Sequence, residues 1–227
     1  MSYVITPVTQ PSVEVSGTRD RFPVRRIFCV GRNYAAHARE MGNDDREPPF
    51  FFTKPADAIV ASGSTVPYAL RTANFHHEVE LVVALGGGGA NIPVAKANSL
   101  VYGYAVGIDL TRRDLQSDAR DHGRPWDTSK GFDKSAPIAA IRPVSAGGLI
   151  DSARIWLSVN GKIRQDANVA EMTWKVPEII AELSTLFEIA AGDLIYTGTP
   201  AGVGPLVRGD SVEAGIEGLD PLTIRIS

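Results

Sequence analysis

The chain has 227 residues, of which 44% are apolar and 22% charged, and this suits one large domain with a sizeable core. The net charge of −3 is spread along the sequence and no run approaches the ~20 apolar residues of a membrane span, so we expect neither a nucleic-acid nor a membrane partner. The single cysteine, Cys29, excludes an internal disulfide, and the N-terminus lacks the pattern of a signal peptide, so we expect a cytoplasmic protein.

In chain order, the first part of the sequence predicts an arm, two strands and a helix. Residues 1–25 are expected to form an extended arm or short strands, and residues 26–31 a strand that ends at a glycine. Residues 34–41 have helical character, with an asparagine before them as N-cap and a glycine after them as stop signal. A polar loop over 42–49 then leads into a strand over 50–55.

The remainder of the chain alternates strands with short helices, which predicts an α+β fold that is mostly β. The four glycines at 86–89 are interpreted as a flexible hairpin between two strands, because no Gly-Lys-Ser/Thr follows them. The dipeptide Asn160-Gly161 is a strong signal for a second hairpin. The expected strands are 76–84, 102–109, 153–160, 163–166, 193–197 and 211–226, the expected helices are 93–100, 112–121 and 176–187, and 122–135 is an expected loop.

Two glutamates in the strand 76–84 are the first candidates for chemistry. Glu78 and Glu80 are two residues apart, so both carboxylates lie on one face of the strand, roughly 6.6 Å apart along it. Like charges repel, and burying them costs several kcal/mol unless they are paired. A divalent cation with oxygen ligands would compensate them, whereas a solvated strand face would give them no function.

A second strand, over 102–109, has one bulky face and one face almost without side chains. Glycine and alanine make up the small face, and Asp109 ends it. Such a face leaves space for a ligand or for another backbone, and a third carboxylate beside it suits a cation with a small substrate. The alternative is close sheet packing on glycine, with Asp109 capping the next segment of the chain.

Four motifs resemble the fumarylacetoacetate hydrolase family and occur in the family's order: His-His-Glu-Val-Glu-Leu, Gly-Ile-Asp-Leu-Thr-Arg-Arg-Asp-Leu-Gln, Gly-Arg-Pro-Trp-x-x-x-Lys-Gly-Phe-Asp and Tyr-Thr-Gly-Thr-Pro-Ala-Gly-Val-Gly. The resemblance runs from about Arg26 to the C-terminus. It implies a single catalytic domain over 26–227, built as the family's mixed β-roll with a few peripheral helices. It also implies a homodimer and a Mg²⁺ or Mn²⁺ ion held by Glu78, Glu80 and Asp109.

His37 and Glu40 form a candidate catalytic pair. On a helix their three-residue spacing places them on the same side, where the carboxylate can orient the histidine and raise its basicity. An exposed helix pair without a function is the alternative. The resemblance implies that His37 activates water, that Glu40 assists it, and that the element moves as a lid.

Four further side chains are candidates for oxyanion stabilisation and substrate binding. Arg113 and Gln116 share one side of a helix that Thr111 is expected to cap, and Gln116 can donate to an oxyanion. Lys130 lies among acidic residues, which favours a surface ion pair, but the resemblance implies that it faces the substrate oxygens. Thr197 follows a strand, and the resemblance implies that its loop contacts the substrate carboxylate.

Two residues near these sites have weaker signals. Arg32 precedes the His37 pair on the same loop, and we expect it to contact the substrate. His76 shares the strand face of the two glutamates, but three carboxylates with substrate and water oxygens suffice for Mg²⁺ or Mn²⁺, so we do not expect it to be a ligand.

The resemblance implies hydrolysis of the C–C bond of a 1,3-diketo acid. The expected substrate is fumarylpyruvate, an intermediate of aromatic (gentisate) degradation, and the products are fumarate and pyruvate. Another acylpyruvate hydrolase, or an oxaloacetate decarboxylase or isomerase, remains open, since an enolate held by a metal serves these reactions too. The distant alternative is a non-enzymatic Ca²⁺-binding β module, which would need neither His37, Lys130 nor Gln116.

Overall fold

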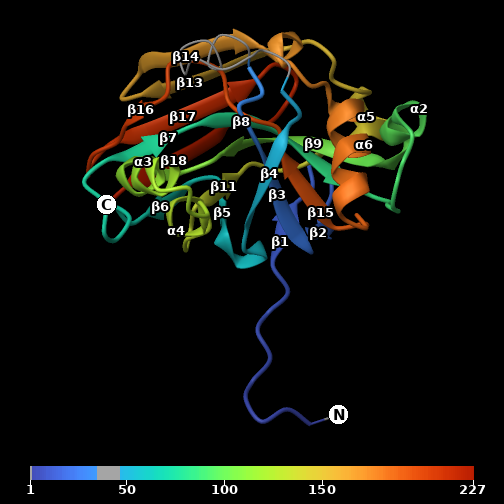
Figure 1. The fold of residues 1–227 in the computed structure, drawn as a ribbon, viewed down its shortest axis with the longest axis horizontal. Coiled ribbons are helices and arrows are strands. Elements are labelled where there is room, and N and C mark those ends of the chain that lie inside the picture. Colours follow the sequence, from blue (N-terminus) through green and yellow to red (C-terminus); the bar gives the residue numbers. More distant parts are fainter. Residues whose placement is uncertain (1, 35–46) are drawn as a thin grey trace.

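The computed structural model describes residues 2–34 and 47–227. An eight-stranded mixed sheet forms the centre of the fold, in the order β4-β3-β15-β8-β9-β11-β5, with β12 paired to β9 (Figure 1). Its strands are β3 (Arg26–Gly31), β4 (Phe50–Lys54), β5 (Ile59–Ala61), β8 (Val79–Leu85), β9 (Val101–Ile108), β11 (Ala136–Ile138), β12 (Arg142–Pro143) and β15 (Asp193–Tyr196).

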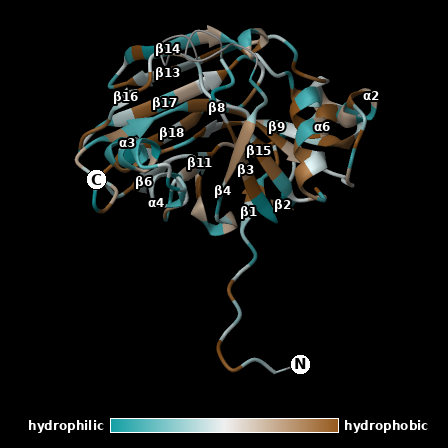
Figure 2. Cartoon of the chain, viewed as in Figure 1, coloured by the Kyte–Doolittle hydropathy of each residue, from teal (hydrophilic) through white to brown (hydrophobic). Residues whose placement is uncertain are grey.

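A five-stranded sheet, in the order β14-β13-β17-β18-β6, covers one face of the central sheet. It consists of β6 (Ser64–Val66), β13 (Arg154–Val159), β14 (Lys162–Asn168), β17 (Ser211–Ile216) and β18 (Leu222–Ile226). The larger core lies between the two sheets, where Leu81 and Val106 share one cluster with Leu157 and Val212. In the central sheet, β8 is buried along its whole length and is apolar apart from Glu80, as burial on both sides requires. The strands of the outer sheet mix apolar and polar residues, because one of their faces is exposed (Figure 2).

Two small sheets and a few helices complete the fold. The small sheets pair β1 (Ser12–Glu14) with β2 (Arg21–Pro23), and β7 (Phe75–His77) with β10 (Thr111–Arg112) and β16 (Gly204–Pro205). The α-helices are α2 (Val94–Ala97), α3 (Arg113–Asp121), α4 (Asp127–Lys130), α5 (Val144–Gly147) and α6 (Val176–Leu186), and the 3₁₀ turns are η1 (Ala56–Ala58), η2 (Asn98–Leu100) and η3 (Val169–Glu171). The prediction of a mostly β fold is confirmed. In the part of the chain that the structure describes, no helix has the length and apolar character needed to cross a membrane.

Residues 2–11 extend from the body as an arm (Figure 1). Its apolar side chains are largely exposed, with Val4, Ile5 and Val8 at 103%, 77% and 91%.

The predicted hairpin at Asn160-Gly161 is confirmed, because β13 and β14 pair as antiparallel neighbours and both turn residues have positive φ. Other expectations need correction. The glycines 86–89 begin the connection between the antiparallel neighbours β8 and β9, as expected, but the connection is longer than a simple hairpin because it contains α2 and η2. The expected loop 122–135 contains α4, a single turn too short to show a helical period.

The strand expected over 76–84 is divided at Glu78 into β7 and β8, which belong to different sheets. The small face of β9 is packed rather than open. A Cβ atom on Gly107 would lie 2.6 Å from a ring carbon of Tyr196, and one on Gly103 would collide with the backbone oxygen of Arg142. The expectation of ligand space over this face is therefore wrong, and close packing on glycine is the correct interpretation.

Candidate active site

Three buried carboxylates converge where β8 and β9 meet. Asp109 directly follows β9, and its N–H donates to the backbone oxygen of Glu78 across the strands at 2.8 Å. Glu80 pairs with Gly107 two residues further along the same ladder. Because alternate residues of paired strands share a face, the ladder brings the carboxylates together, and their ligand atoms lie within 4.8 Å of one another.

Two buried lysines and an arginine compensate two of these carboxylates. Lys130, at the end of α4, is only 2% exposed and donates to Glu78 Oε2 at 2.7 Å and to Asp109 Oδ2 at 2.6 Å. Lys54 Nζ lies 2.7 Å from Asp109 Oδ1, and Arg113 donates to Glu78 Oε1. Each oxygen of Glu78 and Asp109 thus faces a cation. The surface ion pair that the local sequence favoured for Lys130 is not formed.

Glu80 is different, because no cation among the described residues pairs with it. Its carboxylate accepts a hydrogen bond of 2.8 Å from the N–H of Gly198. Burial, together with the charges of Asp109 and Glu78, raises the pKa of Glu80 well above its ordinary value. Although burial acts in the same direction at Glu78, the charges of Lys130 and Arg113 hold the pKa of Glu78 well below its usual range.

The three carboxylates fit a hard divalent cation. They offer only oxygen ligands, which Mg²⁺ and Mn²⁺ prefer, and an octahedral ion at about 2.1 Å from its ligands would place them about 3 to 4.2 Å apart. Glu80 has no ion pair within the described residues, and the charges of Asp109 and Glu78 add to the cost of burying its own charge. This favours a further positive charge beside Glu80.

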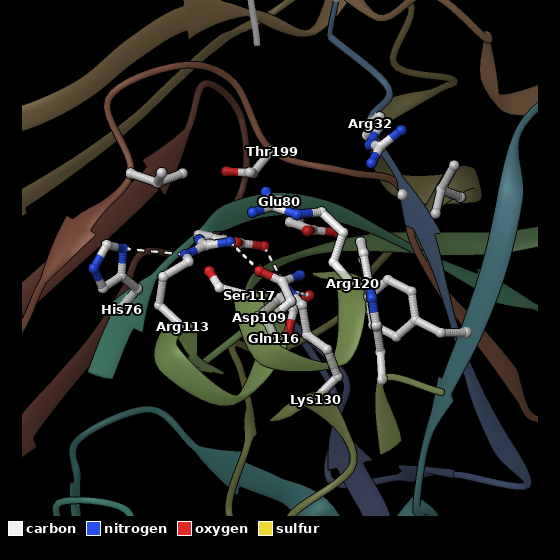
Figure 3. A pocket seen from close by; sticks show the side chains of 16 residues that line it. Arg32, His76, Glu80, Asp109, Arg113, Gln116, Ser117, Arg120, Lys130 and Thr199 are labelled. Atoms are coloured by element: carbon white, nitrogen blue, oxygen red, sulfur yellow. Dashed lines mark hydrogen bonds and ion pairs between the residues drawn. The ribbon is translucent and has the colours of Figure 1, made fainter. Parts of the chain in front are cut away.

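A cavity of about 330 Å³ opens beside the carboxylates (Figure 3). Helix α3 lines it with residues three, four and seven positions apart, which lie on one helix face: Arg113, Gln116, Ser117 and Arg120. Arg32 and Phe52 also line the cavity, and Figure 3 shows Arg32 well away from Arg113. The cavity therefore combines carboxylates at its base with basic side chains on its walls.

Arg113 orients two of its neighbours. Besides its ion pair with Glu78, it donates to Gln116 Oε1, so the amide NH₂ of Gln116 is the donor group left for a ligand. Its Nε donates to His76 Nδ1 at 3.4 Å. Burial and the charge of Arg113 lower the pKa of His76 to about 4, so this ring is neutral at pH 7 and accepts the bond. The predicted helix cap by Thr111 is wrong, because that residue lies in β10 and its hydroxyl contacts Asp109 and Lys130.

The two threonines after β15 have different surroundings. The hydroxyl of Thr197 donates to the backbone oxygen of Leu81 at 2.9 Å and is fully buried. Thr199 lines the cavity, and Gln165 Nε2 donates to its hydroxyl oxygen at 2.8 Å. Because that oxygen accepts a bond from Gln165, the hydroxyl proton of Thr199 is available to a ligand. Thr199, rather than the predicted Thr197, is the threonine that meets the cavity.

Residues 26–227 match the family described as fumarylacetoacetate (FAA) hydrolase C-terminal. The chain belongs to the fumarylacetoacetate hydrolase family. The resemblance carried by the four motifs is thereby confirmed.

Relatives within the family are named for different activities. A fumarylpyruvate hydrolase of Ralstonia sp is 46% identical over 180 residues, which are 79% of this chain and 93% of that protein. A mitochondrial oxaloacetate tautomerase of Mus musculus is 41% identical over 202 residues, 89% of this chain and 91% of that protein. The crystal structure of fumarylpyruvate hydrolase from Pseudomonas aeruginosa with Mn²⁺ and pyruvate is 49% identical, has a TM-score of 0.97, and the match covers 99% of both chains. The family's β-roll fold is therefore confirmed.

The structure assembles most of the family motifs in this chain around one cavity. Glu78, Glu80, Asp109 and Lys130 lie together, and the predicted substrate contacts Arg32 and Arg113 line the same space as Gln116. His37 and Glu40 lie outside the described residues. The sequence did not lead us to predict Lys54 as a site residue. A signal was present, because Lys54 alternates with Phe50 and Phe52 on β4 and so lies on the same, largely apolar face of the strand.

Thr199→Val is expected to raise KM for an acidic substrate and lower kcat/KM about tenfold or more, because the ligand loses a hydroxyl donor. Thr197→Val should act mainly on stability, since it removes a buried hydrogen bond to Leu81. Steady-state kinetics and thermal unfolding of both variants separate the two roles. If kcat/KM falls more in Thr197→Val than in Thr199→Val, Thr197 and not Thr199 is the substrate contact.

Proposed function

We propose that this protein is a metal-dependent hydrolase that cleaves fumarylpyruvate to fumarate and pyruvate. The observation that carries the proposal is the convergence of Glu78, Glu80 and Asp109 beside a cavity with basic walls. The Pseudomonas aeruginosa relative supports it, because its structure holds Mn²⁺ and pyruvate, and pyruvate is one product of this reaction.

The proposed metal ligands are Glu78, Glu80 and Asp109. A Mg²⁺ or Mn²⁺ ion bound there would polarise the oxygens of a keto acid and favour the enolate as leaving group. The side chains around the cavity would bind and orient the substrate: Thr199 and Arg32 through hydrogen bonds to its carboxylates, and Arg113 by holding Glu78 and Gln116 in place.

The proposed general base is His37, with Glu40 as its partner. His37 would take a proton from water, whose oxygen attacks the acyl carbonyl next to the methylene carbon. The bond between these two carbons then breaks, releasing the acid and the pyruvate enolate. Return of the proton to the enolate carbon gives pyruvate, so one water molecule is consumed in each turnover.

Gln116 and Lys130 are the proposed donors to the oxyanion. The amide NH₂ of Gln116 is available, because its oxygen already accepts from Arg113. The ammonium of Lys130 bonds to Glu78, Asp109 and Thr111, so it would exchange one of these contacts for the substrate oxygen.

Oxaloacetate tautomerisation or decarboxylation is the second candidate. The 41% identity to the mouse tautomerase supports it, and a site that stabilises the enolate of a 2-keto acid would serve these reactions as well. A homodimer and a cytoplasmic location stay part of the proposal. The exposed apolar side chains of the N-terminal arm support a second copy as partner, since within one chain they bury little surface.

Turnover of fumarylpyruvate, acetylpyruvate and oxaloacetate by purified protein, with Mn²⁺ and after removal of metal by EDTA, tests the proposal. We expect metal-dependent release of fumarate and pyruvate from fumarylpyruvate, with the highest kcat/KM of the three substrates. Oxaloacetate turnover far above that of fumarylpyruvate would replace the proposal with the second candidate. Full activity without metal would contradict the assigned ligands.

A further inference from the structure

We propose that Arg120 forms a second anion subsite, which binds the carboxylate at the far end of the acyl group. The subsite would make the enzyme selective for acylpyruvates that end in a carboxylate. This inference rests on the proposed function, because it assumes that the keto-acid end of the substrate lies at the three carboxylates.

Helix α3 lines the cavity along two of its turns. Arg113, at its start, contacts the carboxylate site through Glu78, and Arg120 lies seven residues later on the same face. A rise of about 1.5 Å per residue separates their backbones by about 10 Å. This is of the order of the length of an extended seven-carbon diacid such as fumarylpyruvate. A four-carbon diacid such as oxaloacetate is too short to span this distance.

Among the described residues, three basic side chains near the carboxylates are already engaged. Lys130 has its three donors on Glu78, Asp109 and Thr111. Lys54 contacts Asp109 and two backbone oxygens, and Arg113 holds Glu78 and Gln116. These cations balance protein carboxylates, so a distal carboxylate of the substrate needs another partner.

Arg120 has the properties of that partner. Its side chain lines the cavity (Figure 3) and is 45% exposed. It pairs at 3.0 Å with the exposed carboxylate of the adjacent Asp121. An exposed pair of this kind contributes little, so exchanging Asp121 for a substrate carboxylate costs little. The planar guanidinium can then bind that carboxylate through two parallel hydrogen bonds.

Arg32 is the competing candidate, since it also lines the cavity. Its guanidinium lies 5.7 Å from the ring of Phe50, and its Nε is buried without a partner among the described residues. A substrate lying along α3 places its far end against Arg120. Arg32→Gln therefore belongs in the same experiment.

The test compares kcat/KM for fumarylpyruvate and acetylpyruvate, which share the diketo-acid core but differ in the distal carboxylate. With saturating Mn²⁺, Arg120→Gln should lower kcat/KM for fumarylpyruvate about 10- to 100-fold, mainly through KM, and should change acetylpyruvate far less. Arg120→Lys should lower kcat/KM for fumarylpyruvate less than Arg120→Gln does, because lysine keeps the positive charge but not the planar guanidinium. Arg124→Gln is the matched control, an exposed arginine just beyond α3 that does not line the cavity, and it should leave the ratio of the two substrates unchanged.

Equal losses on both substrates, or no loss on fumarylpyruvate, would overturn the role of Arg120. A selective loss in Arg32→Gln with none in Arg120→Gln would move the subsite to Arg32 and overturn it as well. A wild-type protein that cleaves neither acylpyruvate would instead defeat the proposed function, so the two failures are distinguishable.

Discussion

Glu80→Gln is expected to remove nearly all turnover and, at the same time, to stabilise the metal-free protein. Glu80 is a proposed metal ligand, so its neutralisation should lower kcat/KM at least about 100-fold. Substitution of residues that only hydrogen-bond to metal ligands already lowers metal affinity or activity 10- to 100-fold. The same substitution should raise the stability of the metal-free protein. The buried carboxylate lies close to Asp109 and Glu78, and within the described residues its bonding partner is only the N–H of Gly198.

The sign of this effect comes from the raised pKa of Glu80. A carboxyl group whose pKa is higher in the folded than in the unfolded state stabilises the fold only at acidic pH, and this contribution is lost as pH rises through the unfolded and then the folded value. At pH 8 the group therefore weakens the fold. A glutamine removes the charge and still offers an oxygen to the Gly198 N–H, so the melting temperature in EDTA should rise, by about 2–4 °C for each kcal/mol gained.

Thermal unfolding with EDTA and with Mn²⁺ measures both effects. Mn²⁺ should raise the melting temperature of the wild type and leave that of Glu80→Gln nearly unchanged. Glu213→Gln is a matched control, because it makes the same chemical change on the exposed face of β17. Retained turnover, or an Mn²⁺ response equal to that of the wild type, would show that Glu80 is not a ligand.

Most of the fold can be predicted from the sequence, because its signals are local. Alternating apolar residues mark β8 and β9, and Asn160-Gly161 marks the hairpin of β13 and β14. The cluster of three carboxylates is also predictable in part, since the spacing of Glu78 and Glu80 already places them on one face. The alternation does not show that a ring from another strand, Tyr196, fills the small face of β9.

The remaining parts of the site depend on contacts between distant segments. Thr197 and Thr199 lie in the same turn, and the difference between them comes from Gln165, on β14, which bonds to Thr199. Lys130 lies between Asp127 and Asp133 in the sequence, but α4 places it in the interior, where Lys54 contacts its backbone oxygen. Such partners are far apart in sequence, so local patterns cannot identify them.

Lys130→Met is expected to have the largest effect on the stability of the metal-free protein. The ammonium bonds to Glu78 and Asp109, and removing one partner of a buried ion pair typically costs about 3–5 kcal/mol. For a chain of this size, the melting temperature in EDTA should fall by roughly 10 °C. Mn²⁺ should raise it by more than in the wild type, because a divalent ion supplies the positive charge that the two carboxylates lost.

Kinetics at saturating Mn²⁺ then separate the structural role of Lys130 from its proposed role as oxyanion donor. Loss of such a donor typically lowers kcat about 10²–10³-fold, with a smaller effect on substrate binding. Lys96→Met, on the exposed surface of α2, is the matched control and should change neither quantity. If Lys130→Met has a low melting temperature but a near-normal kcat, Lys130 balances the charge of the carboxylates and is not an oxyanion donor. An unchanged melting temperature in EDTA would contradict the buried ion pairs themselves, because methionine cannot bond to either carboxylate.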